Sequence, residues 1–449
     1  MRADTVLHNA KVYTKGEVLD AGIAIKNGRI IEVAKEAHLP VAEDYIDLNG
    51  CLALPGLIDV HVHLRDQLQA YKEDFRTGTA AAVVGGITSV LDMPNNQPIT
   101  MDSSSLRERI LLAQQVVVAN VGFYSAFSQK TDEIEEVARE GAIAFKVYLT
   151  SQVGDLDIDD DEALLHAFNA ASRLGVPVAV HAEDRKIIKS IADHEQTLGH
   201  ETSDAYQKAH TPEAETKAVA RILRITRNSS AHIHFCHISS SQALTLIQKA
   251  AKSGSRVSCE VTPHHLLLTS QGFKQQGNLL LTDPPVRSRK TMIELWEAVK
   301  ARQIDIIASD HAPHSIDEKM VDSVWNVKPG IPGLETLLPL LLTKVNEGWF
   351  SVNDVVRLTA ENPAKIFHLN QNGFLRKDYD ANITVVDMRR KSKIDASHFY
   401  SKAKYSPFDK WDVKGVPIKT FVNGKLVMDE GEVIAKGVAG KILSPANSN

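Results

Sequence analysis

The chain of 449 residues is longer than one hydrophobic core usually serves, so we expect one large domain and a smaller one. Its hydrophobic share of 43% and charged share of 24% are those of an ordinary folded protein. The formal net charge is only −5, and no basic block could follow a phosphate backbone. These values argue against nucleic acid as a partner.

The three cysteines, Cys51, Cys236 and Cys259, lie far apart and form no C-x-x-C pair. This pattern argues against a disulfide framework and against a thiolate zinc site. The start of the chain, MRADTVLHNAKVY, has no apolar core behind a basic segment, and no stretch approaches the roughly 20 apolar residues of a membrane span. We therefore expect a cytoplasmic protein that is neither secreted nor bound to a membrane.

Both ends of the chain have the texture of β-structure. Polar and apolar residues alternate in short runs up to about residue 50, with a hairpin signal at Asn27-Gly28. The same alternation returns in residues 381–387 and 418–434, around Asn423-Gly424. We predict one β-sandwich built from both ends, its first part in residues 1–54 and its second part, with a C-terminal tail, in residues 366–449.

Residues 55–365 have the rhythm of βα units, in which short apolar runs alternate with longer amphipathic stretches such as ALLHAFNAASRLG and AVARILRI. The TDEIEEVARE run is read as a solvated helix face. Eight runs are candidate strands: 57–62, 87–93, 120–126, 142–149, 176–182, 232–239, 256–262 and 304–310. The fold class is therefore α/β, with a TIM-type (β/α)8 barrel as the catalytic domain.

Polar residues gather where these runs end, which in a barrel is one mouth. The six residues concerned are His61, His63, Lys146, His181, His237 and Asp310. His61 and His63 lie two apart on one strand and so face the same side. Four imidazoles and a carboxylate suit two divalent cations of the zinc type, held close together. The alternative is a set of buried, hydrogen-bonded histidines.

Two cations need a bridging anion, and Lys146 occupies the strand end where one is expected. Because an ammonium would be repelled by the cations, the lysine must be neutral there. A neutral amine can add carbon dioxide, and the resulting carbamate could bridge two metals. The alternative is a lysine whose head reaches solvent or an acidic partner.

Seven motifs in order carry a family resemblance: DVHVHLRD (59–66), DMPNNQP (92–98), AFKVYL (144–149), HAED (181–184), CHIS (236–239), PPVR (284–287) and DHAPH (310–314). Together they resemble dihydroorotases of the class I, lysine-carboxylated type, within the cyclic amidohydrolases. The resemblance runs from about residue 5 to 430. It implies reversible hydrolysis of dihydroorotate to N-carbamoyl-aspartate in pyrimidine biosynthesis, by a homodimer or homotetramer acting on a small molecule.

Carried over by residue, the resemblance implies that His61, His63 and Asp310 hold one metal with carboxylated Lys146. His181 and His237 would hold the second, and the carbamate would bridge. It implies that Asp310 is the catalytic acid and base. It further implies substrate contacts at His63, Arg65, Asn95, Asp283, His314, Pro329 and Gly330.

Arg65 favours an acidic substrate independently of the family, because a guanidinium offers a planar fork that matches a carboxylate. The structural alternatives are a salt bridge between Arg65 and Asp66, and a turn-forming role for Asn95 after proline.

Two departures from the family pattern bear on the substrate. Dihydroorotases commonly continue HLRD with Pro-Gly, whereas this chain reads HLRDQLQ; and Asp283 stands where Asn usually precedes Pro-Pro. An allantoinase, or a dihydropyrimidinase or hydantoinase, is therefore the alternative enzyme. The alternative outside enzymes is an inactive dihydroorotase-like scaffold, whose signature would be lost metal ligands; all six positions are filled here.

Overall fold

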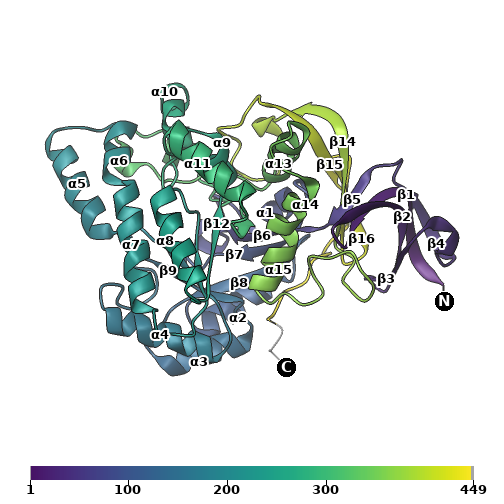
Figure 1. The fold of residues 1–449 in the computed structure, drawn as a ribbon, viewed down its shortest axis with the longest axis horizontal. Helices are drawn as coiled ribbons and strands as arrows, with labels where there is room; N and C mark the ends of the chain where they lie inside the picture. The colour runs from purple at the N-terminus through teal and green to yellow at the C-terminus, as the bar shows by residue number, and fades with distance from the viewer. Residues whose placement is uncertain (1, 446–449) are drawn as a thin grey trace.

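The computed structural model describes residues 2–445, as a barrel surrounded by helices with a mixed β-sheet beside it (Figure 1). The N-terminal strands lie in the sheet farthest from the barrel. The last part of the described chain returns to the same sheet, so the two ends share one structural unit, as predicted.

Eight parallel strands form the barrel and follow one another in chain order. They are β6 (Leu57–Val62), β7 (Ile87–Asp92), β8 (Asn120–Ala126), β9 (Ala144–Tyr148), β10 (Val178–His181), β11 (Ile233–Phe235), β12 (Val257–Val261) and β13 (Ile306–Ile307). A parallel bridge between Val62 and His311 brings the first strand against the chain that follows the last. The His63 N–H donates to the His311 carbonyl at 2.8 Å there. All eight predicted strands are confirmed.

Helices cover the outside of the barrel. The larger ones are α1 (Phe75–Val84), α2 (Ser103–Ala113), α3 (Thr131–Glu140), α4 (Asp161–Arg173), α5 (Arg185–Thr197), α7 (Pro212–Ile225), α8 (Ser241–Lys252), α11 (Arg289–Lys300) and α13 (Leu337–Asn346). Local chemistry sets their starts: the Asp160 carboxylate accepts from the first turn of α4, and Thr211 caps α7 just before Pro212. The predicted solvated run is α3, which buries Ile134 and Val137 and exposes its acidic face.

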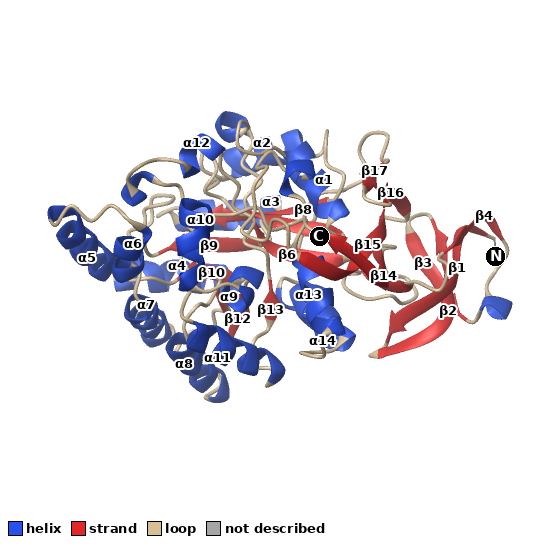
Figure 2. Cartoon of the chain, turned by 90° about the horizontal axis from the view of Figure 1, so that it is seen from above, coloured by secondary structure: helices blue, strands red, loops and turns tan. Residues whose placement is uncertain are grey.

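The terminal unit is one nine-stranded mixed sheet (Figure 2). Its strands are β1 (Ala3–Thr14), β2 (Glu17–Lys26), β3 (Arg29–Ala34), β4 (Ala42–Asp47), β5 (Leu52–Pro55), β14 (Ile383–Lys393), β15 (Asp412–Val422), β16 (Lys425–Asp429) and β17 (Glu432–Val433). Both predicted hairpin turns are present: Asn27-Gly28 joins β2 to β3 with positive φ at both residues, and Asn423-Gly424 joins β15 to β16.

Strand β5 connects the two units. It pairs with β1 on one side and with β14 on the other, so it lies where the chain ends meet. Only Gly56 separates it from barrel strand β6. The sheet therefore leads directly into the strand that carries His61. Within the described part of the chain, none of the helices has the length and apolarity needed to cross a membrane.

Candidate active site

Three predicted ligands meet where β6 and β13 end. The Nε2 atoms of His61 and His63 each lie 3.4 Å from Oδ1 of Asp310. All three side chains are buried, and their ligand atoms lie close enough together to hold one metal ion. The two histidines point the same way because they lie two residues apart along extended chain, His61 in β6 and His63 directly after its end.

The outer ring nitrogens of these histidines are held by neighbouring oxygens. Nδ1 of His61 contacts the Glu260 carboxylate, and Nδ1 of His63 lies 2.7 Å from Oδ1 of Asn95. Both oxygens are acceptors, so each Nδ1 carries a hydrogen and each Nε2 is directed toward Asp310. This is the arrangement by which outer partners orient metal-ligating histidines.

A second pair of nitrogens faces inward at the ends of β10 and β11. Nδ1 of His181 lies 3.0 Å from Nε2 of His237, and the opposite nitrogen of His181 lies 3.0 Å from the Glu183 carboxylate. The Glu183 carboxylate therefore accepts a hydrogen bond from the Nε2–H of His181, and the lone pair on Nδ1 faces His237. The rings of His61 and His237 lie with centroids 5.2 Å apart, so the two groups are neighbours.

Lys146 lies on β9 and is fully buried. Its Nζ donates to the Cys236 sulfur at 2.9 Å and lies 4.8 Å from the centre of the Tyr148 ring. The predicted alternative of a lysine head at the surface or in an ion pair is thus not what the structure has. Cys236 also lies close to His61 and Glu260, in a further group with metal-ligand spacing.

Burial and the neighbouring charges shift the pKa values of the candidate metal ligands. Burial and the Arg65 charge lower the pKa of His63 to about 3, and burial beside His181 lowers the pKa of His237 well below its usual range. Burial and Lys146 oppose protonation of His61, but Glu260 and Asp310 raise its pKa to about 10. Burial alone would raise the pKa of Asp310, yet the surrounding histidines hold it well below normal.

These observations fit a divalent metal site. The inner imidazole nitrogens and an ionised carboxylate converge, and the outer nitrogens are already occupied by carboxylates and an amide. The proton that His61 carries at neutral pH stands where two carboxylates favour a positive charge, and a metal ion would displace it.

Arg65 begins a second, cationic part of the site. Its Nη2 donates to Nε2 of His314 at 3.2 Å. The other nitrogen of His314 lies 3.3 Å from the Glu318 carboxylate, which binds the Lys72 ammonium at 2.8 Å. Burial together with Arg65, Lys72 and Lys319 lowers the pKa of His314 far below its usual range. The neutral ring therefore accepts from Arg65 and donates to Glu318.

Arg65 itself has no carboxylate within ion-pair distance among the described residues. The residue is only 6% exposed, and its buried Nε has no hydrogen-bond partner among the described residues. The predicted alternative of a bridge to Asp66 does not form, because the Asp66 carboxylate accepts from the Gln67 and Phe75 backbone N–H groups. A buried, incompletely satisfied guanidinium is suited to an anionic ligand.

The loop without Pro-Gly takes an unusual backbone path. Arg65, Asp66 and Gln67 all have positive φ, between 48° and 60°. Such residues cost about 1–3 kcal/mol each and persist only when their surroundings hold them. Here Nη1 of Arg109 donates to the Arg65 carbonyl at 2.7 Å, while Arg109 also pairs with buried Asp92. Asp310 is likewise left-handed, with φ 48°.

Asp283 lies beside His210 and His181. Its Oδ1 lies 3.1 Å from Nδ1 of His210 and 3.9 Å from Nε2 of His181. Burial and the Glu183 charge raise the pKa of Asp283, whereas the carboxylates of Glu183 and Asp283 raise the pKa of His210 to about 10 against the effect of burial. Asp283 is thus paired with a histidinium instead of standing as an isolated negative charge.

Pro329 and Gly330 lie in the loop that closes beside this carboxylate. The Gly330 N–H donates to the Leu281 carbonyl at 2.8 Å, two residues before Asp283. Gly330 has φ 137°, and a Cβ there would collide with the Ala312 carbonyl. Only glycine allows the loop to approach the DHAPH segment this closely.

The structure adds residues that the sequence did not single out. Two of them are carboxylates that hold predicted ligands: Glu260 contacts His61, and Glu183 contacts His181. His210 pairs with Asp283, and His234 contacts the second oxygen of Glu260 at 3.0 Å. The available signal was a charged residue inside an apolar strand, as Glu260 is in RVSCEVT. No comparable sequence pattern marked His210, since it follows a helix, residues 203–209, that was not predicted.

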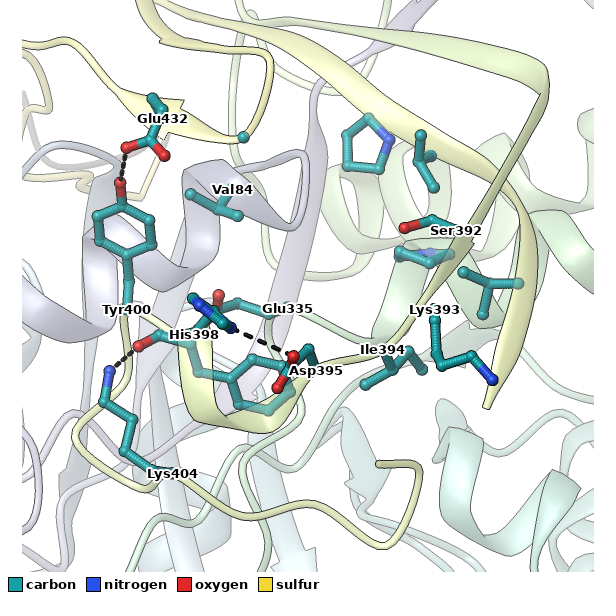
Figure 3. Close-up of a pocket in the computed structure, with 16 residues that line it drawn as sticks. Val84, Glu335, Ser392, Lys393, Ile394, Asp395, His398, Tyr400, Lys404 and Glu432 are labelled. Carbon is teal, nitrogen blue, oxygen red and sulfur yellow. Dashed lines mark hydrogen bonds and ion pairs between the residues drawn. The ribbon is translucent and has the colours of Figure 1, made fainter. Parts of the chain in front are cut away.

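A separate pocket of about 580 Å³ lies between the barrel and β14–β15, away from these residues (Figure 3). The Tyr400 hydroxyl donates to Glu432 there at 2.9 Å, and His398 pairs with Asp395. Glu335 accepts from the Ser401 N–H at 3.1 Å, and the Ser401 hydroxyl donates to Glu73. None of the predicted site residues lines this pocket.

Comparison with known proteins agrees with the geometry. A model of the amidohydrolase family matches residues 52–427. The chain belongs to the amidohydrolase family. A dihydroorotase of Methanothermobacter thermautotrophicus is 36% identical over 433 residues, covering 96% of this chain and 95% of that one. A dihydroorotase of Pyrococcus furiosus is 34% identical over 441 residues, covering 98% and 96%. The predicted family is confirmed.

Ring hydrolases of another name are also similar. An L-hydantoinase of Paenarthrobacter aurescens is 31% identical over 451 residues, covering 99% of this chain and 98% of that one. The solved L-hydantoinase from Arthrobacter aurescens superposes with a TM-score of 0.95 at 30% identity, over 98% of this chain and 100% of that one. A dihydropyrimidinase from Brevibacillus agri gives 0.90 at 26%, over 98% of each chain. The predicted barrel is confirmed, and the substrate depends on the side chains around it.

Proposed function

We propose that this protein is a dihydroorotase, which interconverts dihydroorotate and N-carbamoyl-aspartate in pyrimidine biosynthesis. The observation that carries the proposal is buried Arg65, whose guanidinium contacts His314 and has no carboxylate partner among residues 2–445. Dihydroorotate has a ring carboxylate that would complete this pair. The unsubstituted dihydrouracil ring has none.

We propose that two divalent metal ions, of which zinc is the expected one, are held by His61, His63, His181, His237 and Asp310. A carbamate on Lys146 would complete the set. When bound, such ions would polarise the ring amide carbonyl and make water more acidic.

The protein side chains bind the substrate and move a proton. Arg65 binds the carboxylate, and His314 joins it when its hydrogen moves to Nε2, because Nδ1 then accepts from the Lys72 ammonium 3.3 Å away. Asn95, Asp283 and the Pro329–Gly330 backbone surround the ring. His63 contacts Asp310 and is close enough to Arg65 for that charge to lower its pKa, which supports its proposed contact with substrate. Hydrolysis adds water to the amide carbonyl and breaks the C–N bond. Asp310, which is ionised, accepts a proton from the water and passes it to the ring nitrogen. Ring closure runs the same steps in reverse and consumes a proton, so a lower pH favours it.

The deciding experiment measures ring closure of N-carbamoyl-aspartate beside hydrolysis of allantoin, dihydrouracil and hydantoin. A dihydroorotase turns over the first and leaves the others nearly untouched. Preferential hydrolysis of an uncharged ring would overturn the proposal in favour of an allantoinase, dihydropyrimidinase or hydantoinase.

A matched variant tests the residue that does the chemistry. Asp310→Asn should retain metal and lose turnover, because the amide keeps an oxygen donor but accepts no proton. Normal turnover in this variant would contradict the role of Asp310. An inactive scaffold would show neither turnover nor bound metal in the unmodified protein. The cytoplasmic location, the homodimer or homotetramer and the domain limits at residues 54 and 365 stay predictions.

A further inference from the structure

Lys319 is a buried lysine that belongs neither to the candidate metal ligands nor to the Arg65–His314 pair described above. It ends the short helix α12 (Ile316–Lys319) and has no measurable exposure. Its Nζ donates to three backbone carbonyls: those of Leu281 at 3.0 Å, Lys328 at 3.2 Å and Gly330 at 3.0 Å. No carboxylate lies within ion-pair distance of it among residues 2–445.

Burying an ammonium without a carboxylate partner costs free energy. An ammonium removed from water without a counter-charge is strongly disfavoured, and burial lowers the pKa of Lys319 to about 7. Three carbonyl dipoles use all three of its hydrogens, which is the full donor capacity of the group. A methionine would fill the same space without the cost of burying a charge, so packing alone does not explain a lysine here.

The three carbonyls belong to two segments that meet at the substrate pocket. Leu281 precedes Asp283 by two residues, while Lys328 and Gly330 flank Pro329. A hydrogen bond from the Gly330 N–H to the Leu281 carbonyl joins the segments directly, and the Tyr405 hydroxyl donates to the Gly330 carbonyl at 3.3 Å. No ladder of strand hydrogen bonds connects the two segments, so these few bonds set their separation.

We propose that Lys319 is a positioning residue, an ammonium clasp that holds the 281–283 and 328–330 segments at the separation the bound ring requires. The inference rests on the proposed function only for the identity of that ring. It predicts that loss of the ammonium weakens substrate binding while metal binding and the chemical step are retained.

The test compares Lys319→Met with Lys290→Met, an exposed lysine on helix α11, in the metal-loaded protein. In Lys319→Met we expect KM for N-carbamoyl-aspartate to rise about 10-fold or more, with kcat and metal content near those of the unmodified protein, because ground-state positioning is lost. Hydrogen exchange should quicken in peptides containing residues 281–283 and 328–330 and stay unchanged in the barrel strands. Lys290→Met should behave as the unmodified protein.

Tyr405→Phe provides a second variant that keeps the fold. It removes the hydrogen bond to the Gly330 carbonyl and the one that the hydroxyl accepts from the His314 backbone, so the readout specific to the clasp is faster exchange in the 328–330 segment, with a smaller rise in KM. A KM increase in Lys319→Met without faster exchange would overturn the clasp, since the ammonium would then act through its charge on the bound anion. Unchanged KM with unchanged exchange would overturn it as well. The exchange measurement needs no substrate, so it distinguishes failure of the clasp from failure of the proposed dihydroorotase activity.

Discussion

Glu260 offers the sharpest test of how the metal ligands are oriented. One of its oxygens contacts Nδ1 of His61 and accepts from the His237 N–H at 3.1 Å, while the other lies 3.0 Å from Nε2 of His234. Glu260→Gln keeps the shape and one acceptor oxygen. His234 can reverse its tautomer to meet the new amide, because its other nitrogen faces the Ser258 hydroxyl, which donates or accepts. The substitution therefore removes charge with little change of geometry.

The magnitude follows from replacing one charge-assisted hydrogen bond with a neutral one. Bonds to charged groups contribute about 1.5–3 kcal/mol and neutral ones about 0.5–1.5 kcal/mol, so the difference is about 1.4 kcal/mol, or roughly 10-fold in metal affinity. Outer partners of metal ligands typically have effects of about 10–100-fold. Glu260 also favours the competing proton on His61, but a divalent ion gains more from the same carboxylate. A net loss of about 10-fold is therefore expected.

The assay is zinc competition with a chromophoric chelator at fixed pH. Asp305→Asn is the control, because the Asp305 carboxylate accepts from the N–H of Cys259, the residue before Glu260, at 2.9 Å but contacts none of the six predicted ligands in the described part of the chain. We expect it to lower the melting temperature and leave zinc affinity unchanged. Equal zinc affinities of Glu260→Gln and the unmodified protein would refute the reasoning that this carboxylate orients His61.

Three further predictions concern the remaining charged groups. Lys146→Ala should lose tight metal binding, and short carboxylic acids should restore part of it by supplying the missing anion; no recovery with acids or bicarbonate would argue against the carbamate. Arg65→Met should raise KM for N-carbamoyl-aspartate about 100-fold, the loss of a paired charge being worth about 3 kcal/mol, and an unchanged KM would remove the reason for preferring an acidic substrate. Burial lowers the pKa of Lys319 from 10.5 to about 7, so between these values the unfolded chain binds more protons than the folded one. Stability should therefore rise with pH in this window, by at most about 5 kcal/mol, and urea unfolding of Lys319→Met should lack this rise.

The fold was predictable to a large extent from residue order alone. The eight barrel strands are short apolar runs between amphipathic stretches, and in parallel sheets both faces are buried, so such runs are easily recognised. The Asn-Gly turns at residues 27 and 423 were equally clear, because few residues accept positive φ. Strand β13 is much shorter than predicted. The prediction covered 304–310, but ladder pairing reaches only Ile306–Ile307 before the chain bends toward left-handed Asp310.

The candidate ligands were also visible in the sequence, because His61 and His63 share a strand face and the other four end barrel strands. Their orientation was not visible. The hydrogen on each imidazole is placed by Glu260, Asn95 and Glu183, which come from other strands and loops. Sequence spacing gives no information on such partners, since they are brought together only when the barrel closes.

The substrate-facing residues show the same division. The sequence by itself determined the family, the barrel and the residue types available for chemistry, because these follow from local periodicity and ordered motifs. Only the tertiary structure decided that Arg65 meets His314 instead of Asp66, that Asp283 is paired with His210, and that Lys319 joins two distant loops. Each of these contacts spans many residues of chain, and its free energy depends on burial and on distances that no local sequence pattern encodes.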